Sequence, residues 1–256
     1  MSKRQEARAR RRRQQMMSRL LVIGMVILGA LLIACALALP SIDAARVRAT
    51  QQAGLTMTPV STGVPRTVTA PSDKTSVGDP AAPVRVDVWE DFQCPACQYY
   101  SQDIETLIIQ NYVETGKVYY TYHFFTSISS YTPGNTESEH SANAAMCASD
   151  QGRFWDYHDI LYANWNGENA GAFADYRLVA FAEALGLDMK EFNTCFESDK
   201  YADFVAEDYQ AGKDWGVQGT PAIFVNGVMV VSPRGERYVA TYEEIVVYIE
   251  AALAGE

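Results

Sequence analysis

Two cysteines, Cys94 and Cys97, are the residues whose type and spacing point most directly to chemistry. They are separated by Pro95 and Ala96, so on a helix both side chains would lie on the same side, one turn apart. At this separation the two sulfurs can form or break a disulfide with each other. Such a pair can exchange disulfides with other thiols, and the attacking species is a thiolate.

The residues around the cysteines have the pattern of a β-strand that passes into a helix. Valines alternate with other side chains over residues 84–89, which predicts a strand. Pro95 suits the first turn of a helix, where its missing N–H costs nothing. Unpaired backbone N–H groups and the helix dipole favour a thiolate at this point. We therefore expect Cys94 to have a lowered pKa and to be the attacking sulfur, with Cys97 closing or opening the disulfide.

The alternative chemistry is a zinc site, of which Cys94 and Cys97 would be half. A structural zinc site usually needs a second Cys or His pair at short spacing. The other cysteines and the histidines are Cys35, Cys147, Cys195, His123, His140 and His158. They are scattered, so the sequence offers no second pair, and we assign no histidine to catalysis. We expect no metal and no cofactor.

Charge is divided unevenly along the sequence. Residues 1–19 carry eight Lys and Arg against one Glu, a charge of +7, so the remainder carries −17 of a total of −10. Such an acidic remainder would repel phosphates, and we expect no nucleic acid partner.

Residues 20–39 form a run of twenty residues without a charge, followed by Pro40. A helix of this length spans about 30 Å, the thickness of a bilayer core. The arginines before it predict a cytoplasmic N-terminus by the positive-inside bias. We predict a basic cytoplasmic tail over residues 1–19 and a single transmembrane helix over residues 20–39 in the lipid bilayer of the cell membrane. The catalytic domain would then be extracytoplasmic.

Two alternatives to a permanent anchor remain open. The apolar run could be a cleaved signal peptide, although it is long for that role. Residues 32–35 also resemble a bacterial lipobox, which would make Cys35 a lipidated N-terminus. In all three cases the rest of the chain lies outside the cytoplasm, where disulfides form and persist.

The remainder of the chain has the pattern of an α/β domain behind a spacer. Residues 40–80 form the predicted extracytoplasmic spacer, with Thr, Ser, Pro and Gly in its second half. A strand over 84–89, a helix over 94–115 and a strand over 117–125 predict a βαβ unit with parallel strands.

An all-helical insertion is predicted at about residues 128–215. Its expected helices cover residues 139–148, 154–165, 176–185, 188–197 and 200–215. Strands follow at 222–225 and 228–231, joined by Asn-Gly, a strong hairpin signal. A capping box at Thr241 predicts a last helix over 242–253.

This order of elements, with Cys-x-x-Cys after the first strand, resembles the thioredoxin fold as elaborated in DsbA-like thiol-disulfide oxidoreductases. The resemblance covers about residues 80–253 and rests on the sequences of residues 90–97, 147–158 and 219–227. It implies a thioredoxin-like α/β domain over residues 81–256 that contains the helical insertion.

The resemblance also implies roles for individual residues. Cys94 would be the nucleophile that forms a mixed disulfide, and Cys97 would resolve it. Pro221 matches the cis-proline of the family and would face the dithiol, with the backbone of Thr220 presented to an extended substrate peptide.

The family commonly holds a buried acid six residues before the nucleophile, as a proton relay. That position is Val88 in this sequence. Glu90 is the preferred candidate for the relay, because strand alternation would point Asp87 to the opposite face. Two exposed acids at the strand end are the alternative.

Cys147 and Cys195 lie in predicted helices of the insertion. In an oxidising compartment they are expected to form a structural disulfide, which some DsbA-like proteins carry in this region. Otherwise they would be small buried hydrophobic residues.

The resemblance implies an enzyme that oxidises the thiols of reduced or misoxidised client proteins through a Cys94–Cys97 disulfide. Re-oxidation would then need a quinone-linked membrane oxidase of the DsbB or vitamin-K-epoxide-reductase type. A disulfide reductase or isomerase on the same fold is one alternative, since the sequence does not set the reduction potential. A non-catalytic, membrane-tethered chaperone or adaptor that uses the same groove is the other.

Overall fold

The computed structural model describes residues 16–17, 69–132, 134–235 and 239–255. The chain divides into two units, Met1–Thr58 and Pro59–Glu256, and the fold is described here for the second. The predicted membrane span at 20–39, its lipobox alternative at Cys35 and nearly all of the basic tail lie outside the described residues. Within those residues, no helix is long and apolar enough to cross a membrane.

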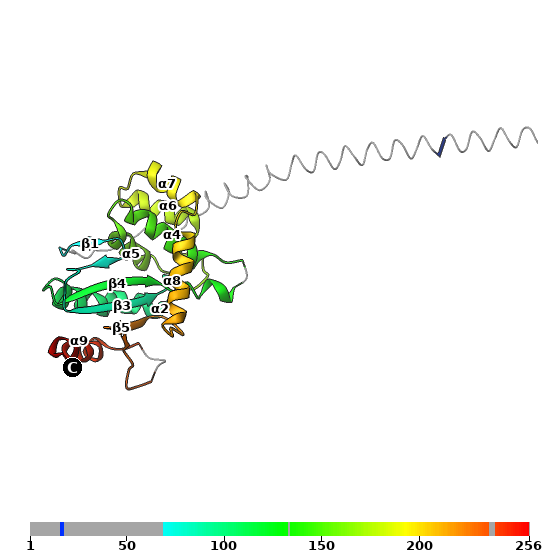
Figure 1. Ribbon diagram of the computed structural model, residues 1–256. Helices are drawn as coiled ribbons and strands as arrows, with labels where there is room; N and C mark the ends of the chain where they lie inside the picture. The colour runs from blue at the N-terminus through cyan, green and yellow to red at the C-terminus, as the bar shows by residue number, and fades with distance from the viewer. Residues whose placement is uncertain (1–15, 18–68, 133, 236–238, 256) are drawn as a thin grey trace, which may run out of the picture. The chain divides into compact units, whose positions relative to one another are not determined.

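In the described part of the second unit, the strands form one six-stranded mixed sheet (Figure 1). The strands are β1 (Ser72–Asp73), β2 (Ser76–Val77), β3 (Val84–Glu90), β4 (Val118–Phe124), β5 (Ala222–Val225) and β6 (Val228–Met229). Their order across the sheet is β1-β2-β4-β3-β5-β6. β3 and β4 are parallel over their full length, as the predicted βαβ unit requires, whereas β5 is antiparallel to β3.

Alternation along β3 gives the sheet two different faces. Val84, Val86 and Val88 lie in the main hydrophobic core, whereas Trp89 belongs to a second, smaller cluster. The strand is flanked by β4 and β5 and is buried on both faces for most of its length. This central strand ends at Glu90, four residues before Cys94, and provides a rigid support for the cysteine loop.

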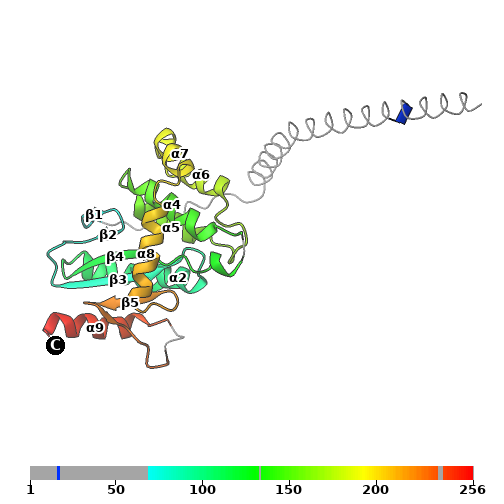
Figure 2. The same cartoon turned by 45° about the vertical axis from the view of Figure 1, so that its right-hand side comes forward.

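Helices cover both faces of the sheet (Figures 1 and 2). After β3 come α2 (Pro95–Tyr100), η1 (Ser101–Glu105), α3 (Thr106–Ile108) and η2 (Ile109–Val113). The insertion holds η3 (Ser129–Tyr131), α4 (Glu137–Ser149), α5 (Phe154–Ala163), α6 (Asp175–Ala184), α7 (Met189–Glu197) and α8 (Ala202–Asp214), and α9 (Tyr242–Ala254) ends the described chain. α8 crosses the Trp89 face, where a Cβ at Gly212 would lie 2.7 Å from the Trp89 ring. Glycine at that position therefore permits the close approach of helix and sheet.

The predicted elements are present, with differences at their boundaries and in one helix. The helix predicted over 94–115 contains two π-helical segments, η1 and η2, which its apolar periodicity did not indicate. The sheet also begins earlier than predicted, because β1 and β2 form a hairpin within the predicted spacer. β2 pairs with β4 and its Val77 is fully buried, although the strands are too short to show a period-2 pattern.

Candidate active site

Cys94 occupies the N-cap position of α2, and Pro95 is the first helical residue. The loop before it is closed by a hydrogen bond from the Cys94 N–H to the carbonyl of Asp91 at 2.9 Å. Cys97 lies within the helix and is fully buried, whereas 7% of Cys94 is exposed. The two cysteines are free thiols in this structure. The predicted strand-to-helix setting of the dithiol is thus present.

The two thiols have opposite electrostatic surroundings. A hydrogen bond from Cys97 is the largest influence on Cys94 and outweighs burial, which acts in the opposite direction. Together with the Thr220 side chain and the N–H groups of Ala96 and Cys97, it lowers the pKa of Cys94 to about 7. Burial, followed by the neighbouring Cys94 and the charge of Glu90, raises the pKa of Cys97 well above its ordinary value. Cys94 is therefore the more easily ionised sulfur.

Thr220 and Pro221 lie beside Cys94, just before β5, the strand that pairs with β3. The peptide bond between them is cis, as the resemblance implied for Pro221. The Cys94 thiol donates to the Thr220 carbonyl at 3.3 Å. Both residues are partly exposed and directly precede β5. The backbone expected to face a substrate peptide thus lies beside the Cys94 sulfur.

Glu90 lies on the face of β3 that carries Val88, and it is fully buried. The Tyr162 hydroxyl donates to its Oε2 at 3.0 Å, and its charge acts on Cys97. Asp87 points to the opposite face, where it pairs with His123 Nε2 at 3.1 Å. The alternation expected along this strand is therefore kept, and the exposed-acid alternative does not hold for Glu90.

His123 joins α8 to the sheet. Its Nδ1 pairs with Asp208 at 2.9 Å, while its Nε2 pairs with Asp87. The two carboxylates outweigh burial and raise the pKa of His123 to about 9. This charged bridge is on the face of the sheet away from Glu90 and has a structural function.

The cysteine loop is held by residues to which the sequence analysis assigned no role. Asp91 accepts hydrogen bonds from Gln93 N at 2.9 Å and from Ile128 N and Ser138 Oγ, both at 3.0 Å. Burial outweighs these bonds and raises the pKa of Asp91 to about 6. Trp165 Nε1 donates to the Gln93 carbonyl at 2.7 Å. The helical insertion thus fixes the loop that carries Cys94, through contacts too distant in sequence to be seen as a motif.

Behind Cys97, three buried side chains converge. Ligand atoms of Glu90, Glu105 and His158 lie within 4.8 Å of one another, and among the described residues this is the group suited to hold a metal ion. His158 Nε2 lies 3.7 Å from Glu105. Two carboxylates around one imidazole suit a bound cation or shared protons equally well. These three residues are far apart in the sequence, so no motif indicated that they form a group. The group includes neither Cys94 nor Cys97.

The remaining cysteines of the described domain form a disulfide. Cys147 of α4 and Cys195 of α7 are joined across 48 residues, with their Cα atoms 5.8 Å apart. Both are buried in the helical insertion. The disulfide joins α4 to α7, and both of its cysteines are distant in sequence from the cysteine loop.

Comparison with known proteins agrees with this geometry. Residues 71–250 match the model of a protein family described as Thioredoxin. The chain is 25% identical over 158 residues to the probable disulfide bond formation protein D of Bacillus cereus, covering 61% of this chain and 71% of that protein. Among solved structures it is similar to oxidised BdbD from Bacillus subtilis, with a TM-score of 0.61, 22% identity, and coverage of 73% of this chain and 97% of that one.

A different kind of relative is matched over part of its length. The chain is 32% identical over 151 residues to the Na(+)/H(+) antiporter NhaA 3 of Salinispora tropica, which covers 59% of this chain. The chain spans only about a fifth of the length of the Salinispora antiporters that it matches.

Proposed function

Because the chain belongs to this thioredoxin family, we propose that it is a thiol-disulfide oxidoreductase that oxidises the thiols of client proteins. The observation that carries the proposal is the asymmetry of the dithiol, in which Cys94 has a pKa lowered to about 7 and Cys97 has a raised one. The similarity to proteins named for disulfide bond formation supports the same activity.

The reaction begins with Cys94 and Cys97 joined as a disulfide. A thiolate of the reduced client attacks Cys94, the bond between the cysteines breaks, and its electron pair goes to Cys97. A second client thiolate then attacks the client sulfur of the mixed disulfide, and Cys94 leaves as a thiolate. The client loses two electrons and two protons, and the protein dithiol gains them.

The departing Cys97 sulfur needs a proton, because its burial disfavours the thiolate. The protonated carboxyl of Glu90 is the proposed donor, since it is buried on the same face of β3 and is close enough to Cys97 for its charge, when ionised, to act on that sulfur. Tyr162 orients the Glu90 carboxyl through its hydrogen bond. Glu105 and His158, within 4.8 Å of Glu90, are placed to share that proton.

The cellular setting belongs to the same proposal. The uncharged run at residues 20–39, with the basic residues before it, supports a membrane anchor and an extracytoplasmic catalytic domain. A net oxidant must be re-oxidised after each turnover, and a quinone-linked membrane oxidase is the proposed partner. The test is labelling of Cys94 in intact cells that are first treated with a reductant and then with a thiol reagent, neither of which crosses membranes. Labelling that requires cell lysis would contradict this location.

The direction of the reaction is tested by equilibrium with glutathione. A reduction potential of about −120 to −180 mV would support an oxidase or isomerase, whereas about −270 mV would support a reductase. Retention of full biological activity by Cys94→Ser would support the chaperone or adaptor alternative and contradict catalysis.

A further inference from the structure

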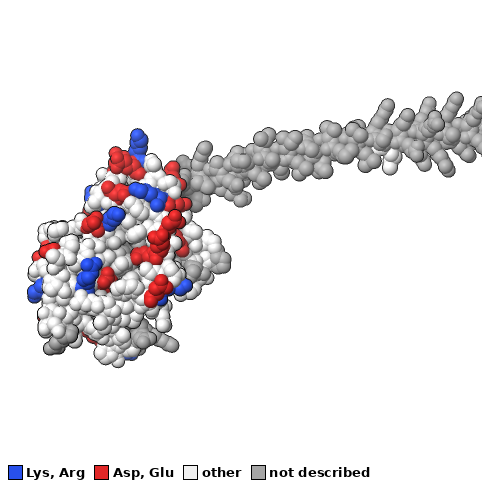
Figure 3. All heavy atoms as spheres, in the orientation of Figure 1, with Lys and Arg blue, Asp and Glu red and all other residues white. Residues whose placement is uncertain are grey.

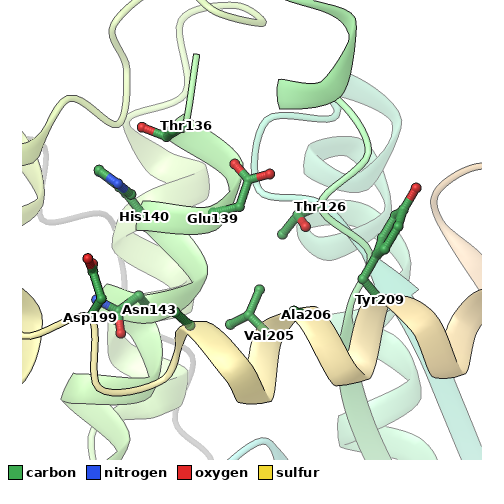
Figure 4. A pocket seen from close by; sticks show the side chains of 10 residues that line it. Thr126, Thr136, Glu139, His140, Asn143, Asp199, Val205, Ala206 and Tyr209 are labelled. Carbon is green, nitrogen blue, oxygen red and sulfur yellow. The ribbon is translucent and has the colours of Figure 1, made fainter. Parts of the chain in front are cut away.

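The helical insertion contains a pocket that disulfide exchange does not use. It lies between α4 and α8 and has a volume of about 370 Å³ (Figure 4). Small-molecule sites usually measure about 300–1,000 Å³, so this pocket is at the lower end of that range. Its size suits one long side chain better than a large cofactor.

The floor of the pocket is apolar. Val205, Ala206 and Tyr209 line it from successive turns of α8, and Figure 4 shows Val205 and Tyr209 rising from that helix. The Tyr209 ring packs on Phe125, with the ring centroids 4.6 Å apart. A floor of this kind suits the methylene stem of a long charged side chain.

Carboxylates are the main charged groups of the pocket, and His140 is the basic side chain in its lining. Glu139 points from α4 into the space above α8 (Figure 4), and its buried Oε2 atom has no hydrogen-bond partner among the described residues. Asp199 adds a second carboxyl to the lining, which contains neither lysine nor arginine. His140 also lines the pocket, but its Nδ1 pairs with Asp175 at 2.7 Å. Glu139 is partly buried and one of its carboxylate oxygens is buried without a partner in the described part of the chain, an arrangement that favours a cation.

The surroundings strengthen the preference for a cation. Asp203, Glu207 and Asp214 are exposed on α8, and Figure 3 shows acidic side chains gathered on this face of the molecule. Such a field attracts basic groups to this side. The charge of Glu139 also acts on Asp91, three residues before Cys94, which places the pocket within electrostatic reach of the cysteine loop.

We propose that this pocket binds a lysine or arginine side chain of the client while a client cysteine reacts at Cys94. The stem would lie on Val205 and Tyr209, and the charged end would pair with Glu139 and Asp199. The inference rests on the proposed function and adds a preference for clients with a basic residue near the reacting cysteine.

The test uses the oxidised full chain and reduced peptides that contain two cysteines. Matched peptides carry lysine, norleucine or glutamate at a series of distances from the first cysteine, and kcat/KM is measured at low ionic strength. At the best distance, we expect the lysine peptide to react about tenfold faster than the norleucine peptide. Glu139→Gln should abolish that preference, so that the lysine and norleucine peptides react with the variant at equal rates.

Two further variants distinguish binding in the pocket from a general attraction between the acidic surface and basic peptides. Glu207→Gln removes an exposed acid of α8 outside the pocket lining and should keep the preference, whereas Ala206→Leu narrows the pocket without removing charge and should lose it. Equal rates for lysine and norleucine peptides, or an equal effect of Glu207→Gln and Glu139→Gln, would overturn the pocket proposal while leaving oxidation intact. Failure to oxidise any peptide would instead overturn the proposed function on which it rests.

Discussion

The described domain contains two pairs of cysteines that differ in chemistry although they are similarly buried. Cys94 and Cys195 each have 7% of their surface exposed, while their partners Cys97 and Cys147 have 0% and 1%. The pair in the insertion joins two helices across 48 residues, whereas Cys94 and Cys97 share the first turns of one helix. Exposure alone therefore does not distinguish the reactive pair from the structural one.

What distinguishes them is the set of groups around each sulfur. Cys94 accepts a hydrogen bond from Cys97 and lies at a helix N-terminus beside backbone N–H groups and the Thr220 side chain, all of which favour its thiolate. Its partner Cys97 is fully buried and has Cys94 and the charge of Glu90 nearby, all of which disfavour a second thiolate. A pair in which one sulfur is easily ionised and the other is not can be opened and closed repeatedly, whereas a bond across a long loop mainly restricts the unfolded chain.

The largest expected effect is on activity, from Cys94→Ser. Loss of the nucleophile should lower the rate of client oxidation by roughly a thousandfold or more, because the other groups of the site act through that sulfur. Stopped-flow measurement with a reduced dithiol peptide would show this. A rate within tenfold of the native protein would mean that Cys94 is not the attacked sulfur.

Removal of the Cys147–Cys195 disulfide should have the opposite effect, with lower stability and nearly unchanged activity. The double variant Cys147→Ala/Cys195→Ala should lose about 3–4 kcal/mol of unfolding free energy, given the 48-residue separation. Peptide oxidation per folded molecule should stay within about twofold, since both cysteines lie in α4 and α7 of the insertion, distant in sequence from the cysteine loop. Urea unfolding and the peptide assay, run on the same samples, would measure both. A large fall in activity without a fall in stability would contradict the division of roles.

The sequence was sufficient to place the reactive pair but not its surroundings. The valine alternation of β3 and Pro95 after Cys94 are local signals, and they located the strand and the helix start beside the two cysteines. The cis bond at Pro221 was expected from the family resemblance alone, since proline before a strand is ordinarily trans. Local pattern thus fixes the position of each sulfur, whereas part of its surroundings, such as Thr220 beside Cys94, comes from residues distant in the chain.

The features that the sequence patterns did not indicate depend on tertiary contacts or on very short elements. His158 and Glu105 come from different helices and meet Glu90 only in the folded domain. Asp91 was part of a recognised motif, yet its partner Ser138 lies 47 residues away. Strands of two residues, such as β1 and β2, are too short for any periodicity to be detected.

A smaller effect is expected from Glu90→Gln. Without the carboxylate, the pKa of Cys97 should fall toward its ordinary value, because a neighbouring negative charge has been removed. Release of Cys97 should also slow by about tenfold or more if Glu90 donates the proton. Single-turnover rates across pH would report both changes. Asp87→Asn, on the opposite face of the same strand, is the control and should leave the pH profile of Cys97 unaltered.

The central claim is the unequal ionisation of the two sulfurs, and the most direct measurement is the alkylation rate of each cysteine in the reduced protein as a function of pH. Because the thiolate reacts, alkylation of Cys94 should rise with a midpoint near pH 7, and Thr220→Val should move that midpoint upward. Cys97 should stay unreactive over the same range. A midpoint for Cys94 near the ordinary thiol value of 9, or equal alkylation of both cysteines, would contradict the account.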